Sequence, residues 1–269
     1  MFNQEGFPTD IIEYLTYYLH SYDIVALYCI SRYCRYNLIE YGPYPHDGIS
    51  INCVTMVDLK IQLSHMISEI IYFPWIKLKI SPFNDICIKS FWKVINPTTI
   101  IYLNMSNGNF INKLEGVEEC INLEELVLDF SNLNDMSNLE TLKIKTLSID
   151  GTNILYMPYF PQYLEKFSMQ GTLISSIYGI ARCSNLKIFY AAYSLLNSIE
   201  SLKSCLNLKE LILNNTHISD IDCIRYFKNL RKLNISNTNI DDLSPIIWCN
   251  KLMFVNFDDT LIDNFSYLI

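Results

Sequence analysis

The residues in this sequence that are best suited to chemistry, as nucleophiles or metal ligands, are its nine cysteines. Four of them stand three residues before the first apolar residue of a repeated segment: Cys120, Cys183, Cys205 and Cys249. Thiolates that a repeat brings together could ligate a metal such as zinc. However, no pair has the CxxC spacing, and one cysteine per repeat also suits a small buried side chain. We therefore interpret the four as core residues and expect no metal site and no cofactor.

The sequence shows no arrangement of acid, base and nucleophile typical of an enzyme. It lacks the GxSxG, P-loop, GxGxxG and HExxH motifs. The adjacent acids Asp241–Asp242 and Asp258–Asp259 lie in predicted turns, where a solvated surface is a simpler explanation than an acid–base dyad. We expect a non-catalytic protein with no catalytic residue. The four histidines are far apart in sequence and match no ligand spacing: His20, His46, His65 and His217.

The elements that would position any such group are repeats in the second half of the chain. Three segments can be superimposed, each starting 22 residues after the last: LKELILNNTHI from Leu208, LRKLNISNTNI from Leu230 and LMFVNFDDTLI from Leu252. Their period and internal spacing resemble the leucine-rich repeat. The return segments are short, as in ISDI from Ile218, and resemble the internalin-like class, so we expect turns or 3₁₀ helices there.

The central L-x-L of each repeat alternates with period two, which predicts a short strand with one apolar face. One copy cannot bury that face alone, so stacked copies should pair in a parallel sheet over a continuous core. The resemblance implies an α/β solenoid, a leucine-rich-repeat horseshoe or arc with a parallel concave sheet. Residues 100–269 should form this solenoid, and residues 41–99 a linker and degenerate first repeats. The eight regular repeats start at Ile100, Leu123, Ile144, Leu164, Leu186, Leu208, Leu230 and Leu252.

A small residue recurs eight positions after each repeat start, and it usually carries a hydroxyl group. Once buried, that hydroxyl could satisfy backbone groups where the chain turns off the strand. We therefore predict that Thr216 and Thr238 are buried and hydrogen-bonded. The complete column is Gly108, Ser131, Thr152, Thr172, Ser194, Thr216, Thr238 and Thr260.

Residues between the core positions should face the concave side of the sheet. Several of those in the middle repeats are apolar or aromatic, on a face otherwise rich in Asn, Ser and Asp. Such outward side chains can mark a binding surface, although a chain with 19 tyrosines would scatter some of them at random. The expected partner-binding residues are Val127, Phe130, Ile188, Tyr190, Tyr193 and Ile212.

Residues 1–40 differ from the repeats and predict a small helical module, with one helix starting after Pro8 and a second near Asp23. The segment resembles the F-box, because Phe7-Pro8 stands for Leu-Pro and Ile30-Ser31-Arg32 for Val-Ser-Lys. Cys34 departs from the Trp or Phe usual in that family. The alternative is a plain helical cap on the solenoid. The resemblance implies that a Skp-type adaptor would bind at Phe7, Pro8, Ile11, Ile12 and Leu15.

Composition limits the partners. The net charge is −8 and no basic stripe is visible, which argues against nucleic-acid binding. The sequence has no apolar run of about 20 residues and no signal-peptide pattern at its start, so we expect no membrane association and an intracellular, cytoplasmic or nuclear location.

The leading hypothesis is a non-catalytic interaction adaptor. The F-box-like module would dock on the Skp-type adaptor of a cullin–RING ubiquitin ligase, and the solenoid would hold an unknown protein substrate. The alternative is a leucine-rich-repeat scaffold with a helical cap and no ubiquitin role. An enzyme is the least favoured class.

Overall fold

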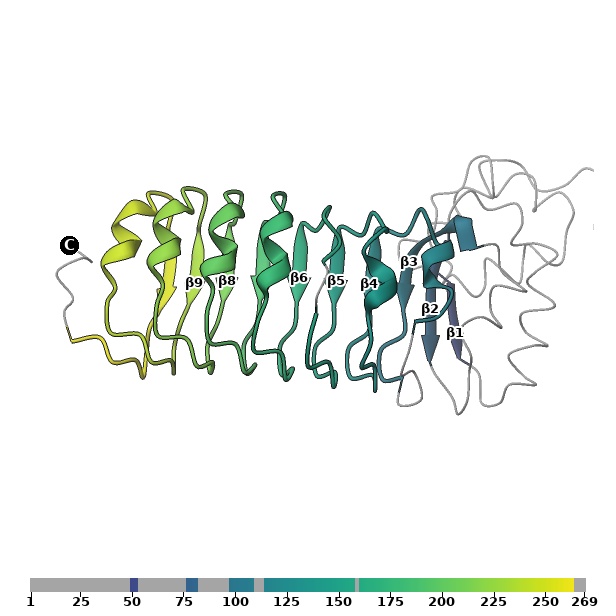
Figure 1. Ribbon diagram of the computed structural model, residues 1–269, viewed down its shortest axis with the longest axis horizontal. Coiled ribbons are helices and arrows are strands. Elements are labelled where there is room, and N and C mark those ends of the chain that lie inside the picture. The colour runs from purple at the N-terminus through teal and green to yellow at the C-terminus, as the bar shows by residue number, and fades with distance from the viewer. Residues whose placement is uncertain (1–48, 53–75, 82–96, 109–113, 158–159, 264–269) are drawn as a thin grey trace, which may run out of the picture.

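The computed structural model describes residues 49–52, 76–81, 97–108, 114–157 and 160–263. The described strands form one ten-stranded parallel sheet in which each strand pairs with the next along the chain. Figure 1 shows the repeats as an elongated open stack that runs from β1 to the C-terminal end. This is the leucine-rich-repeat solenoid that the sequence predicts, and two further strands precede its eight regular ones.

The strands are short because only the central L-x-L of each repeat is extended. Equivalent repeat positions pair directly, as Leu211 does with Leu233, so each column of core residues is continuous. The strands are β1 (Ile49–Asn52), β2 (Ile76–Ser81), β3 (Ile100–Asn104), β4 (Glu125–Val127), β5 (Thr146–Ser148), β6 (Lys166–Ser168), β7 (Ile188–Tyr190), β8 (Glu210–Ile212), β9 (Lys232–Asn234) and β10 (Phe254–Asn256).

The return segments are 3₁₀ helices, as the short repeat predicts, and none of the described elements is an α-helix. Each longer 3₁₀ helix contributes a buried aliphatic residue to the core, such as Ile180 in η4 or Leu202 in η5. No helix within these segments is long and apolar enough to cross a membrane. The helices are η1 (Pro97–Thr99), η2 (Val117–Glu119), η3 (Ser137–Leu139), η4 (Tyr178–Arg182), η5 (Glu200–Ser204), η6 (Asp222–Tyr226) and η7 (Ser244–Trp248).

The hydroxyl column is confirmed. Thr216 and Thr238 are buried, and each hydroxyl donates to the backbone carbonyl three residues earlier, at 2.6 Å. The same bond forms at Thr152, Thr172 and Ser194. The bond supplies a donor to the backbone carbonyl of the last buried residue before the chain leaves the sheet, such as Leu213 or Ile235. Ser131 is the exception, because its Oγ is buried without a hydrogen-bond partner in the described part of the chain.

The N-terminal predictions cannot be compared with this architecture. The helical module of residues 1–40 lies outside the described residues, together with its adaptor-binding positions Phe7, Pro8, Ile11, Ile12 and Leu15. Within residues 41–99, where degenerate first repeats are expected, the structure describes the strands β1 and β2 of the same sheet.

Candidate functional site

The repeated cysteines are core residues, as predicted. Cys120, Cys183, Cys205 and Cys249 are all buried. The Sγ of Cys183 donates to the carbonyl oxygen of Pro161 at 3.4 Å, and burial raises the pKa of this thiol to about 12. A thiol held in this way stays protonated and is a poor nucleophile or metal ligand. Among the described residues, no group of three or more His, Cys, Asp or Glu side chains could hold a metal ion.

Three of the six predicted partner-binding residues lie together on the open face of the sheet. Tyr190 on β7 is directly opposite Ile212 on β8, and Ile188 lies two residues before Tyr190 on the same strand face. All three side chains are partly exposed between buried core positions. We call Ile188, Tyr190 and Ile212 the sheet patch.

Tyr190 is the fixed centre of the sheet patch. Its hydroxyl donates to Oε2 of Glu210 at 2.6 Å, and burial, together with this bond, raises the pKa of Tyr190 to about 12. The Nζ of Lys166 lies 5.9 Å from the centroid of the ring. An aromatic side chain held by neighbours of both charges loses little conformational freedom on binding, which favours it as an interface residue.

Val127 is on the same face but apart from the sheet patch. The strand register places Ser148 and Ser168 between Val127 and Tyr190, a separation of three strands or about 14 Å. A polar ladder fills this gap. The hydroxyl of Ser148 donates to Asp129 and that of Ser168 to Asp150, both at 2.6 Å.

The polar ladder is a feature that the sequence interpretation missed. Its signal is an Asp after one strand followed by a Ser on the next strand, a pattern that occurs twice in succession. Burial raises the pKa of Asp129, while the hydrogen bond from Ser148 opposes that shift. The ladder therefore separates Val127 from the sheet patch on the open face.

Phe130 and Tyr193 do not lie on the sheet face, so the prediction that places them there is wrong. The strands β4 and β7 end three residues before them, and both occupy the turn that follows, with φ angles of 55° and 58°. The period-two alternation stops at the end of the strand, so it no longer decides which way these side chains point. Both are well exposed, at the edge of the solenoid.

Comparisons with known proteins agree with this architecture. Residues 206–248 match the family of Leucine Rich repeats (2 copies). The internalin InlF of Listeria monocytogenes has a similar structure, with a TM-score of 0.66 and 20% identity over 76% of this chain and 59% of that one. Internalin C2 of the same species gives 0.62 and 25%, over 64% of this chain and 77% of that one.

A third Listeria monocytogenes protein, InlJ, whose functional domain includes a cysteine ladder, gives a TM-score of 0.59 and 17% identity over 81% of this chain and 46% of that one. This chain thus spans less than two thirds of InlF and of InlJ. No curated protein sequence matches it. The similarities show that the protein is a leucine-rich-repeat solenoid with internalin-like structural neighbours.

Proposed function

We propose that this chain is a non-catalytic protein-interaction scaffold whose sheet patch contacts the partner. The observation that carries the proposal is the placement of Tyr190, partly exposed, against Ile212 and anchored to Glu210 on the open sheet face. A rigid aromatic residue beside aliphatic neighbours, rimmed by charge, has the composition of an interface centre. The repeat architecture supports the proposal, since solenoids offer extended binding surfaces.

The test compares variants that keep the repeat pattern. Tyr190→Ser with Ile212→Asn introduces the residue types that occupy the same strand position in β6 and β9. The full-length protein, this double variant and an Asn234→Ser control are used as baits, and captured proteins are identified by mass spectrometry. A partner should be lost with the double variant and retained with the control. Equal capture by all three proteins would contradict the role of the sheet patch.

The finer proposal is that the N-terminal segment recruits a Skp-type adaptor of a cullin–RING ubiquitin ligase. Its support is the F-box-like sequence from Phe7 to Ile39 alone. Pro8→Ala with Ile11→Asp should abolish binding to purified Skp-type adaptor in calorimetric titration, and should leave the thermal unfolding of the solenoid unchanged. If the wild-type chain does not bind the adaptor, the simpler scaffold without a ubiquitin role is the better description.

A further inference from the structure

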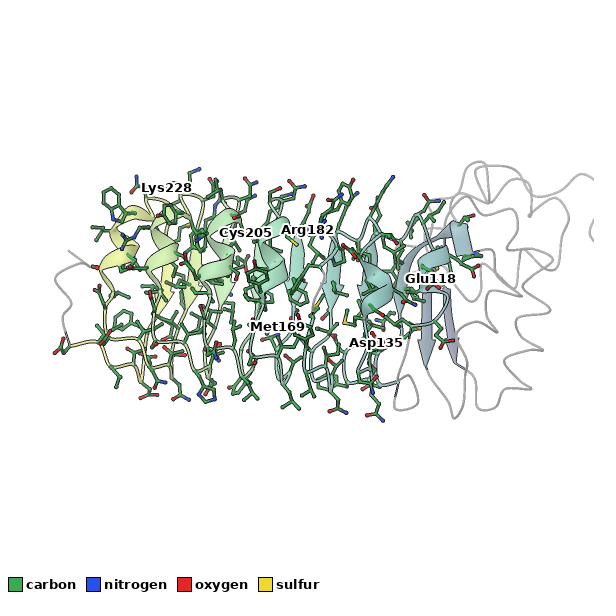
Figure 2. The ribbon with its side chains drawn as sticks, in the orientation of Figure 1. Glu118, Asp135, Met169, Arg182, Cys205 and Lys228 are labelled. Atoms are coloured by element: carbon green, nitrogen blue, oxygen red, sulfur yellow. The ribbon has the colours of Figure 1, made fainter. Side chains whose placement is uncertain are left out.

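Charge is distributed unevenly between the two long edges of the solenoid. The edge where the strands end carries nine Asp residues and no Lys or Arg within the described repeats. In Figure 2 Asp135 lies toward this lower edge, whereas Lys228 is at the opposite edge. We call this lower edge the turn edge. It comprises residues 106–108, 129–135, 150–156, 170–176, 192–198, 214–220, 236–242 and 258–263.

The middle of the turn edge is apolar. Six large hydrophobic side chains are exposed in the four consecutive repeats of β4 to β7, with fractional exposures from 44% to 67%. Leu173 and Leu195 occupy the same position in adjacent repeats, and Phe130 and Tyr193 share another position. We call this set the ridge; its members are Phe130, Leu155, Tyr156, Leu173, Tyr193 and Leu195.

Phe130 and Tyr193 are unusual residues for the conformation they hold. Their position has a positive φ in every regular repeat, and the other six repeats fill it with Asn, Gly or Asp, which tolerate that conformation. A bulky aromatic side chain does not, so the fold itself gives no reason for the two aromatics. Strain of this kind points to a role outside folding. The other six residues are Asn107, Gly151, Gly171, Asn215, Asn237 and Asp259.

Two glycines shape the ridge between these aromatics. The ring of Phe130 covers Gly151 so closely that a Cβ added there would be 2.5 Å from the Cδ1 atom of Phe130. A Cβ added at Gly171 would meet nothing nearer than the backbone of Gly151, at 3.9 Å. The ring of Phe130 therefore covers the backbone of the ridge at Gly151. At Gly171, in the repeat before the one that carries Tyr193, no side chain covers the backbone.

We propose that the turn edge is a second docking surface, for a basic protein segment that places an apolar side chain on the ridge. Exposed aspartates lie at both ends of the ridge: Asp135 in the same turn as Phe130, and Asp220 in the repeat after the one that carries Tyr193. The described part of this edge carries no Lys or Arg, so Lys or Arg side chains of the partner would meet its aspartates without repulsion from such residues. They can also stack on the exposed rings.

The same charge disfavours other macromolecules. Nucleic-acid phosphates and anionic lipid headgroups would be repelled by an edge of aspartates. The inference rests on the proposed function, since it assumes that the chain binds protein, but it concerns a different surface from the sheet patch.

The test uses a random dodecapeptide library displayed on phage and selected on the full-length protein. Enriched peptides are synthesised and titrated against the wild type, against Phe130→Asn with Tyr193→Asn, and against Tyr190→Ser with Ile212→Asn. Asn holds the position of Phe130 in three other repeats, so the turn-edge variant should fold, which thermal unfolding checks. A further variant, Asp135→Asn with Asp220→Asn, removes charge and keeps the oxygen that accepts a backbone N–H.

We expect enriched peptides that combine Lys or Arg with apolar residues. Their affinity should fall about tenfold or more in the turn-edge variant, fall less in the charge variant, and stay unchanged in the sheet-patch variant. It should also weaken as NaCl is raised from about 0.05 to about 0.3 M.

Two other outcomes would overturn the inference. Peptides that lose affinity only in the sheet-patch variant, or that bind independently of salt, would place the interface elsewhere and leave the proposed scaffold function standing. If no peptide is enriched over bare beads, the turn edge does not dock a short basic segment, and the proposed function still stands or falls by the capture experiment at the sheet patch.

Discussion

Tyr190 and Glu210 join strands β7 and β8 through a hydrogen bond of 2.6 Å from the phenol to the carboxylate. The pKa of Tyr190 is raised to about 12 by burial and then by this bond. The unfolded chain therefore ionises first as the pH rises. The neutral phenol therefore contributes its full share to the free energy of unfolding below the ordinary tyrosine pKa of about 10. This contribution is lost as the pH rises from there through the folded-state pKa.

This relationship predicts a pH-dependent difference between the wild type and Tyr190→Phe. The wild type should lose more of its free energy of unfolding than the variant between about pH 8 and about pH 11. Urea denaturation at both pH values measures the two losses. Parallel losses would mean that Tyr190 titrates normally in the folded protein.

The hydroxyl column predicts a contrast between two buried hydroxyl groups. Thr238→Val should cost about 1–3 kcal/mol, because it leaves the carbonyl of Ile235 without its donor. Ser131→Ala should cost clearly less, because Oγ of Ser131 has no hydrogen-bond partner to lose among the described residues. Urea denaturation of both variants provides the comparison, and equal costs would show that the bond at Thr238 does not contribute.

The strand register predicts that neighbouring residues on β9 respond differently. Leu233 is fully buried, so Leu233→Ala should cost about 2–5 kcal/mol through the cavity it leaves. Asn234 points to the open face, where Asn234→Ala removes only partly exposed hydrogen bonds and should cost far less. Thermal and urea unfolding measure both effects.

The repeat itself made much of this fold predictable. Residues such as Leu233, Thr238 and Cys205 recur at fixed repeat positions. Eight copies identified the inward face, seven hydroxyl residues the hydroxyl column and four cysteines the thiol column. Phe130 was assigned to the sheet face because alternation was extended past the end of β4. The better signal was the Asn or Gly at its position in the other repeats, such as Asn215, which marks a left-handed turn.

Features that occur only once in the chain could not be predicted in this way. The bond between Tyr190 and Glu210 depends on one pair of side chains, so only the structure reveals it. The F-box-like segment around Pro8 is short and occurs once, and it lies outside the described residues. It therefore stays a prediction until adaptor binding is measured.

The buried thiols should react slowly with thiol reagents in the folded protein. Burial raises the pKa values of Cys183, Cys205 and Cys223 to about 12, so their thiolates are scarce at neutral pH. In a chain with Cys29, Cys34, Cys53 and Cys87 replaced by Ser, the remaining thiols should resist a disulfide reagent such as DTNB until guanidinium unfolds the protein. Rapid labelling in native buffer would contradict their burial.

The ring of Phe130 over Gly151 gives a prediction with a matched control. Gly151 and Gly171 occupy the same repeat position with φ angles of 63° and 64°, so replacing either with Ala carries the same conformational cost, about 1–2 kcal/mol. Only at Gly151 does the new Cβ also meet the ring of Phe130, at 2.5 Å. Gly151→Ala should therefore be the more destabilising of the two in urea denaturation.

A double-mutant cycle then separates the two causes. In a Phe130→Asn background the ring is gone, and Gly151→Ala should cost no more than Gly171→Ala does, with a coupling between residues 130 and 151 of at least about 0.5 kcal/mol. The coupling between residues 130 and 171 should be near zero, because Gly171 meets no side chain. If Gly151→Ala costs the same with and without the ring, the side chain of Phe130 is mobile in solution. The ring is then not held over Gly151 before a partner binds.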